Sequence, residues 1–115
     1  MMLFLGKKKI ANNLIIYRDM LSQAIGLRFK KIKKSHAYLF PVNFPMLCIV
    51  DTFFVNSEID IYFLDGSFKV IGLKKRIKPF RVVIPKKNTR FILETSPSNK
   101  IKINDVMRVE YTNLI

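Results

Sequence analysis

The chain has 115 residues, of which 50% are hydrophobic and 12% aromatic, so a disordered chain is excluded and one modest core is expected. Twenty-one Lys and Arg against eight Asp and Glu give a net charge of +13, which raises the question of an anionic partner. The single cysteine, Cys48, excludes an internal disulfide and a cysteine-based metal site, and we expect it to be buried and inert.

The N-terminal ten residues do not follow the order of a secretion signal, because five apolar residues precede Lys7 instead of following the charge. No run approaches the roughly 20 apolar residues of a membrane-spanning helix. We therefore expect a cytoplasmic protein of one domain, residues 1–115, with no membrane partner. Fifteen Lys against three Ala fit an AT-rich or hot-growing source.

The first predicted elements are a strand within residues 12–19 and a short helix that Asp19 caps and that ends near Arg28. Gly26 lies near its end, where a glycine can terminate a helix. The buried face of this helix would consist of Met20, Ala24 and Leu27. Residues 29–36 follow with four lysines around Ile32, where we favour a solvated loop over an anion-binding patch.

Strands dominate the rest of the chain. They are predicted within residues 37–42, 46–55, 59–65, 67–75, 80–85, 90–96 and 106–114. Residues 56–58 would join a hairpin, and Asp65-Gly66 is a second hairpin turn. About eight strands and one helix predict a mainly β fold, an antiparallel β-sandwich or small barrel. The expected core residues are Ile59, Ile61, Phe63, Ile92, Val106 and Val109.

Charge is distributed unevenly between these elements. Residues 1–40 have nine Lys or Arg and one Asp, whereas residues 41–65 have four acids and no base. Residues 66–115 have twelve bases and three acids. A basic chain therefore surrounds one acidic segment, and the four acids of that segment require an explanation.

Several kinds of chemistry are absent from the sequence. Only four Gly are present, and none forms a phosphate-binding loop or a nucleophile elbow. The lone His36 excludes a histidine-pair metal site, and in a Lys-rich loop we favour a surface histidine over a catalytic base. We expect neither a metal nor a cofactor.

Asp60 and Glu94 are the candidate catalytic residues. Asp60 lies in the middle of a predicted strand, where Asp is disfavoured, and Glu94 lies within another. If they shared a pocket, two carboxylates could perform acid–base chemistry, for example on a carbohydrate. The alternatives are an exposed Asp60 or a structural ion pair. We expect Asp60 to be at least half buried beside Arg28 or Lys30.

The basic runs at residues 74–81 and 86–90 raise the possibility of nucleic-acid binding. Clustered Lys and Arg bind phosphates, and Phe80 and Phe91 could stack on bases. No RNA-binding signature of interleaved basic and aromatic residues is present. Nucleic acid is therefore a possible partner but not the favoured one.

Four blocks of the chain resemble the family catalogued as domain of unknown function 192, particularly its archaeal members. They are "AIGLRF" (24–29), "DTFFVNSEIDIYFLDGSFKVI" (51–71), "IKPFRVVIP" (77–85) and "FILETSPSNKIKINDVMRVE" (92–110). The resemblance covers residues 14–112 and implies a mostly β domain without an established activity. It places Asp60 and Glu94 within the family pattern. Arg28 and Glu58 depart from that pattern, as a compensating charge pair or as signs of a diverged site.

The function we expect is that of an uncharacterised small β domain that binds a small ligand or a protein partner without catalysis. The acidic residues 51–65 would supply one side of the site and the basic region 74–90 the other. The expected ligand-binding residues are Asp51, Thr52, Asp60 and Arg81. An enzyme acting through Asp60 and Glu94, or a basic nucleic-acid-binding protein, is the alternative.

Overall fold

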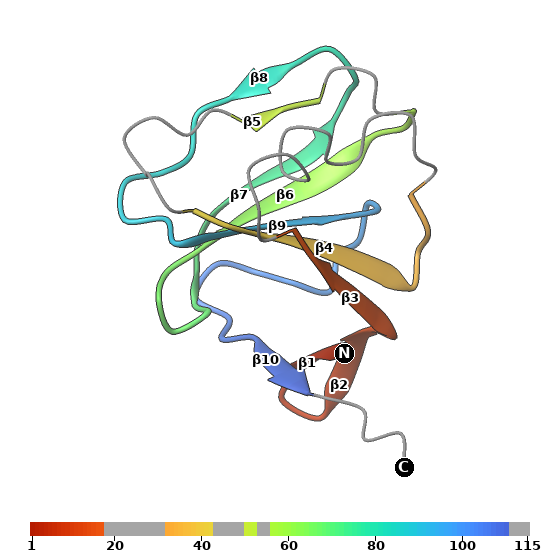
Figure 1. Ribbon diagram of the computed structural model, residues 1–115, viewed down its shortest axis with the longest axis vertical. Coiled ribbons are helices and arrows are strands. Elements are labelled where there is room, and N and C mark those ends of the chain that lie inside the picture. Colours follow the sequence, from red (N-terminus) through yellow and green to blue (C-terminus); the bar gives the residue numbers. More distant parts are fainter. Residues whose placement is uncertain (18–31, 43–49, 53–55, 111–115) are drawn as a thin grey trace.

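The computed structural model describes residues 1–17, 32–42, 50–52 and 56–110 (Figure 1). The helix expected over residues 19–28 lies outside these ranges, as do Arg28, Lys30 and Cys48. Most of the predicted strand 46–55 and the end of the last predicted strand also fall outside them.

The described chain is mainly β, as predicted, and none of the described residues is in a helix. Its strands are β1 (Met2–Leu5), β2 (Lys8–Ala11), β3 (Asn13–Ile16), β4 (His36–Pro41), β5 (Val50–Asp51), β6 (Ile59–Leu64), β7 (Val70–Ile77), β8 (Val82–Val83), β9 (Phe91–Thr95) and β10 (Arg108–Glu110). They form a five-stranded sheet in the order β3-β4-β9-β6-β7, a three-stranded sheet β10-β1-β2 and the pair β5-β8. The β3–β4 pair is parallel and the other pairs are antiparallel. No barrel closes among the described strands.

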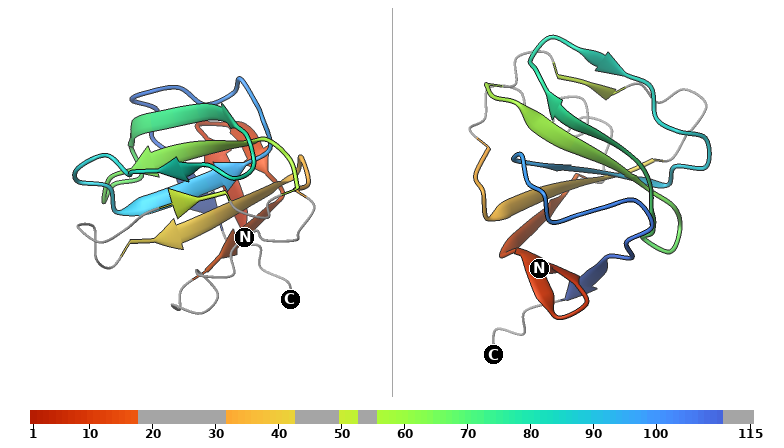
Figure 2. Two further views of the ribbon diagram at one scale, coloured as in Figure 1. Left: turned by 90° about the horizontal axis from the view of Figure 1, so that it is seen from above. Right: turned by 180° about the vertical axis from the view of Figure 1, so that it is seen from behind.

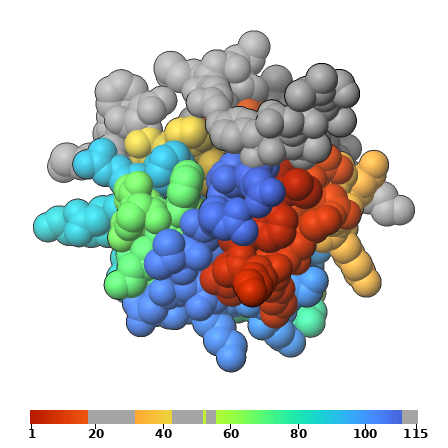
Figure 3. Space-filling model, turned by 90° about the horizontal axis from the view of Figure 1, so that it is seen from below, coloured from red at the N-terminus to blue at the C-terminus, as the bar shows by residue number. Residues whose placement is uncertain are grey.

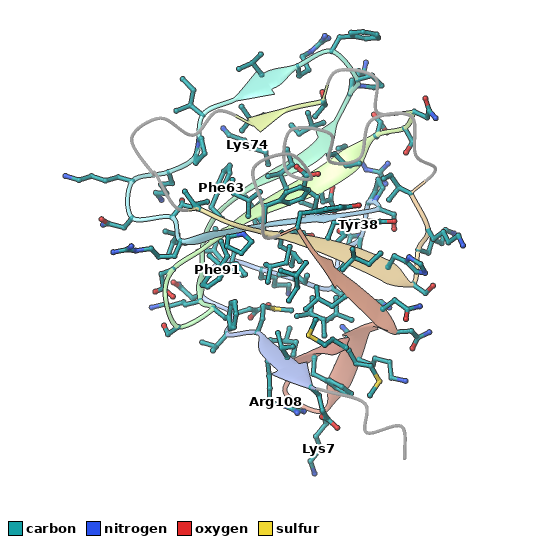
Figure 4. The ribbon with its side chains drawn as sticks, viewed as in Figure 1. Lys7, Tyr38, Phe63, Lys74, Phe91 and Arg108 are labelled. Carbon is teal, nitrogen blue, oxygen red and sulfur yellow. The ribbon has the colours of Figure 1, made fainter. Side chains whose placement is uncertain are left out.

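The five-stranded sheet lies between the other two sheets and is covered on both faces (Figures 1 and 2). One core contains Leu3, Ala11 and Met107 from the region of the three-stranded sheet, together with Tyr62 and Leu64. The other core contains Val83 of β8. Its remaining buried members are Tyr38, Val42, Ile59, Ile61, Phe63 and Ile92. Figure 4 shows the labelled Phe63 and Phe91 on opposite faces.

All six residues of β6 are buried, because β6 is paired on both edges and packed on both faces. The sequence predicted one core face, formed by Ile59, Ile61 and Phe63, and that prediction is confirmed, as is the burial of Ile92. Val109 is partly buried against the first core. Val106 was predicted wrongly: its side chain is 54% exposed, because it forms only an isolated bridge to Lys69.

The turn between β6 and β7 is the hairpin predicted at Asp65-Gly66. Asp65 Oδ1 accepts hydrogen bonds from the Ser67 amide (2.9 Å), the Ser67 hydroxyl (2.8 Å) and the Lys69 amide (3.0 Å). The Lys69 amide is the main cause that holds the pKa of Asp65 below its usual value. Asp65 is therefore a turn residue, which explains one of the four acids.

The other predicted hairpin, between residues 51–55 and 59–65, is wrong. β5 pairs with β8, and both edges of β6 are occupied, by β7 and β9. Strands that are neighbours in the sequence thus belong to different sheets, and the acidic segment does not form one continuous surface.

Strands β1 and β2 form an N-terminal hairpin that the sequence analysis did not predict. Gly6 adopts a positive φ of 61° in its turn, a conformation that glycine tolerates. β10 pairs with the other edge of β1, so the two ends of the described chain lie side by side (Figure 3).

The core assignment predicts a contrast between two substitutions. Ile61→Ala should lower the free energy of unfolding by about 2–5 kcal/mol, because Ile61 is fully buried between β7 and β9. Val106→Ala should change it by less than about 0.5 kcal/mol. Denaturant titration measures both, and equal losses would contradict the assignment.

Candidate functional site

Asp60 is a buried carboxylate with several hydrogen-bond partners, and its side chain is 0% exposed. Its Oδ2 atom accepts hydrogen bonds from Lys75 Nζ (2.6 Å) and the Ser98 amide (2.8 Å). The Tyr62 hydroxyl donates to the same oxygen at 3.2 Å. Oδ1 accepts a hydrogen bond from the Arg76 amide at 2.8 Å. The carboxylate therefore connects β6, β7 and the segment that follows β9.

A bulge in β7 creates this arrangement. Ile59 pairs with Ile77 and Ile61 pairs with Lys74, so Lys75 and Arg76 together lie opposite Asp60. Two residues facing one define a β-bulge. Arg76 has a φ of 52°, and its amide donates to the Asp60 carboxylate. The side chain of Asp60 thus supplies a hydrogen bond at the point where the register shifts.

Asp60 and Lys75 are both charged at neutral pH. Burial alone would raise the pKa of Asp60, but the hydrogen bonds from Lys75, Arg76 and Ser98 outweigh it and hold the pKa below 3.8. Burial alone would lower the pKa of Lys75, but its bonds to Asp60 and Tyr62 raise it above 10.5. Burial is also the main cause that raises the pKa of the Tyr62 hydroxyl. A pair held in this state is a structural ion pair and a poor proton carrier at pH 7.

The predicted burial of Asp60 is confirmed, and its basic partner in the structure is Lys75. Arg28 and Lys30, the partners expected from the sequence, lie outside the described residues. Lys75 also donates to the backbone oxygen of Ser98. Glu58, considered as a partner of Arg28, lies 3.7 Å from Arg76 in an exposed ion pair.

Glu94 does not share a pocket with Asp60. Asp60 pairs with Thr95, and Ile61 pairs with Glu94, so the two carboxylates come from successive positions of the β6–β9 ladder. Successive residues of a strand point to opposite faces. Glu94 is buried and lies opposite Tyr38 on the face of the second core. The two-carboxylate site considered from the sequence is therefore not formed.

Thr52 and Arg81 lie together, but they are joined through the backbone. The Thr52 hydroxyl donates its one proton to the backbone oxygen of Lys78 (2.8 Å), with that of Arg81 as a more distant acceptor (3.3 Å), and accepts from the Arg81 amide (2.9 Å). Asp51 pairs with Val82 in the β5–β8 ladder. This pair covers the second core, on the sheet face opposite to Asp60. The four predicted ligand-binding residues thus do not converge on one site.

A basic pocket lies beside the Asp60 cluster. Its volume is about 30 Å³, and its polar lining consists of Lys34, His36, Thr95, Ser96, Ser98 and Lys100. Ile10 and Ile101 complete its described lining, which contains no carboxylate. His36 Nε2 lies 3.2 Å from Asn13 Nδ2, and the Lys100 amide donates to Ser98 Oγ at 3.2 Å.

The sequence analysis missed this pocket because its residues come from separate segments. The one available signal was the lysine run of residues 29–36, for which an anion-binding patch was the second interpretation. The contribution of residues 95–101 depends on the path of the chain after β9. Asp60 fixes that path through the Ser98 amide.

Two further properties describe the chemistry available. Among the described residues, no group of three His, Cys, Asp or Glu side chains could hold a metal ion. Within the same residues, no helix has the length and apolar character needed to cross a membrane.

Asp60→Asn should lower the free energy of unfolding at pH 7 by about 2–4 kcal/mol, because it leaves the charge of the partly exposed Lys75 without its partner. The folded pKa of Asp60 is depressed, so its stabilisation is present above the unfolded pKa and is lost as pH falls through the folded one. The difference in the free energy of unfolding between wild type and Asp60→Asn should thus shrink once pH falls below about 3.9, the unfolded pKa of Asp.

Denaturant titrations at pH 7, and in steps below the unfolded pKa, measure this difference. Glu58→Gln is the matched control, because its exposed ion pair should contribute less than about 1 kcal/mol. An Asp60→Asn protein as stable as wild type at pH 7 would contradict the structural ion pair.

Thr52→Val should destabilise the protein by about 1–3 kcal/mol, because it leaves the Arg81 amide and the Lys78 oxygen without the hydroxyl. Thr52→Ser keeps the hydroxyl and should cost about 1 kcal/mol, the loss of one buried methyl group. Thermal and denaturant unfolding of the two variants distinguishes the roles. Equal stability of Thr52→Val and wild type would contradict this structural role and would favour the predicted role of Thr52 in ligand binding.

Comparison with known proteins identifies archaeal relatives of the chain. No family model matches it. The UPF0127 protein of Pyrococcus horikoshii is 33% identical over 89 residues, which are 77% of this chain and 71% of that protein. A UPF0127 protein of Pyrococcus abyssi is 25% identical over 105 residues, 91% of this chain and 80% of that protein.

A solved structure confirms the fold. The crystal structure of a protein of unknown function from Novosphingobium aromaticivorans superposes with a TM-score of 0.79. It covers 94% of this chain and 82% of its own, at 17% identity. On the strength of its archaeal relatives, the chain belongs to the uncharacterised UPF0127 family.

Proposed function

We propose that this protein is a non-catalytic binding module for a small oxyanion, such as a phosphate, sulfate or carboxylate group. The observation that carries the proposal is the pocket in which Lys34, His36 and Lys100 meet the hydroxyl-bearing Ser96 and Ser98. Lysine ammonium groups and hydroxyl donors are groups that bind oxyanions. The four blocks that resemble domain of unknown function 192 support membership of that family as well.

The electrostatics around the pocket support an anionic ligand. None of the described residues that line the pocket is acidic, and the nearby Asp60 is neutralised by Lys75. The net charge of +13 adds a long-range attraction for anions. A cationic ligand would meet two lysines with no carboxylate to bind it.

The size of the pocket limits the part of the ligand that enters it. A cavity needs about 10–15 Å³ of space open to the centre of a water molecule to hold one water. The pocket has about 30 Å³ of such space, so it holds one compact charged group. A larger ligand would place its charged group in the pocket and its remainder outside. The ligand class is therefore defined by one oxyanion group.

The site geometry favours binding over the enzymatic alternative. An enzyme using Asp60 and Glu94 requires both carboxylates to face one substrate, and the register of β6 against β9 places them on opposite faces. The Asp60 pair supports the pocket from behind, because it holds the backbone of Ser98 at the pocket wall.

The proposal predicts that inorganic phosphate binds at one site per chain. Replacing Lys34 and Lys100 together by Gln should weaken binding at least ~10-fold, because two cations of the pocket are removed. Isothermal titration calorimetry at low ionic strength measures the dissociation constant.

The matched control replaces Lys7 and Lys9 by Gln, which removes the same charge from exposed positions outside the pocket. It should change the dissociation constant less than about twofold, through the weaker long-range field alone. Equal weakening in both double variants, or no saturable binding by wild type, would overturn the proposal.

A further inference from the structure

Three exposed apolar side chains lie within five residues around β8. Phe80 is 60% exposed, Val82 56% and Ile84 78%. We call these three residues the apolar strip. Only two other large hydrophobic residues among those described are exposed, Ile103 and Val106. A cluster of large apolar side chains on the surface marks an interaction site more often than scattered ones do.

The alternation of a strand explains why Val82 and Ile84 point outward but not why they are apolar, whereas Phe80 precedes β8 and has a positive φ of 62°. Val83 points inward and packs in the second core, so its neighbours on either side point outward. Exposed edges of β-sheets usually have charged residues at such positions, because these prevent association. Here the outward positions are apolar, which indicates that a partner covers them.

Basic residues precede, interrupt and follow the apolar strip in the sequence. Lys78, Arg81, Lys86 and Lys87 are all exposed, and we call them the basic rim. Residues 66–93 contain no Asp or Glu at all. The partner should therefore combine an apolar phase with negative charge.

The position of β8 favours an extended surface, such as a lipid bilayer, over a small ligand as the partner. The β5–β8 pair stands at one end of the molecule, and β1, β2 and β10 stand at the opposite end (Figure 1). Residues 80–84 therefore lie at one end of the molecule, which we call the tip, and their three apolar side chains line no described pocket. Exposed apolar residues at a tip can enter a bilayer interface, whereas a pocket would be needed to enclose a small ligand.

We infer that this tip docks on an anionic membrane surface, with the apolar strip entering the headgroup boundary and the basic rim contacting anionic headgroups. Such docking needs no spanning segment, so it replaces the expectation of no membrane partner, which was based on the lack of an apolar run long enough to span a bilayer. It is independent of the oxyanion pocket, which is lined by other residues.

A single-stranded nucleic acid is the competing partner, and the strip fits it less well. Stacking on bases needs aromatic rings, and Val82 and Ile84 have none. Phe91, the second aromatic residue considered from the sequence, packs on Phe68 with ring centroids 4.6 Å apart. Nucleic-acid binding would use the basic rim and Phe80 but would leave the aliphatic residues without a role.

The test is co-sedimentation with vesicles of phosphatidylcholine mixed with phosphatidylglycerol, against vesicles of phosphatidylcholine alone. Wild type should bind the anionic vesicles and not the neutral ones. The double variant Phe80→Ser with Ile84→Ser keeps every charge and should bind at least ~10-fold more weakly, because the apolar contribution is lost. Ile103→Ser with Val106→Ser is the matched control and should bind as wild type does.

Because the substituted residues are about half exposed or more, both double variants should unfold at the wild-type denaturant midpoint. If the Phe80→Ser, Ile84→Ser protein unfolds earlier, the single variant Ile84→Ser takes its place. Phosphate binding should be unchanged in the Phe80→Ser, Ile84→Ser protein, which separates this inference from the pocket. Vesicle binding that the strip variant retains would indicate adsorption by charge alone and would overturn the inference. Absence of vesicle binding, with Phe80-dependent binding of an oligonucleotide, would overturn it in favour of nucleic acid.

Discussion

The ion pair between Asp60 and Lys75 is the interaction on which the other features of this structure depend. A carboxylate without exposed surface, in the middle of a six-residue strand, requires partners for both oxygens. Those partners are the bulge of β7 and the backbone of Ser98. One side chain therefore fixes the register of the β6–β7 hairpin and the path of the chain that leaves β9.

This pairing also explains the uneven charge of the sequence. The last part of the acidic segment, β6, and the basic strand β7 that follows it are the two strands of one hairpin, joined at the Asp65 turn. Asp60 is paired with Lys75, and Glu58 lies beside Arg76. The acids of β6 and its turns thus have structural roles. The positive charge that faces solvent remains for other partners, at the pocket and at the basic rim.

Local patterns in the sequence were sufficient for the fold class, and non-local contacts were not predictable from them. The run Ile59–Leu64 alternates as a strand should, and the mid-strand Asp60 indicated a buried, paired carboxylate. The partner was not predictable, because a bulge brings Lys75 opposite Asp60 and no local signal encodes that bulge. The same holds for β5, whose partner β8 is about 30 residues away, and for Val106, whose strand-like context does not show that it forms only a bridge.

The candidate site illustrates the same limit. Asp60 and Glu94 both looked functional, but one-residue differences in register decide which face a side chain occupies. The pocket joins Lys34 and His36 to Ser98 and Lys100, more than 60 residues apart, so only the folded chain shows it. The N-terminal hairpin had a local signal in Gly6, which stands between apolar and basic residues at the turn of β1 and β2.

Native-state amide hydrogen exchange at Ser98, followed by NMR, tests the central claim most directly. Ser98 lies outside the strands, and Asp60 accepts its amide hydrogen at a buried oxygen. If the Asp60–Lys75 pair holds this segment, the Ser98 amide should exchange as slowly as the ladder amides of β9, and far more slowly than that of the exposed Asn99. Exchange of Ser98 as fast as that of Asn99 would show that Asp60 does not fix the segment and would contradict this account.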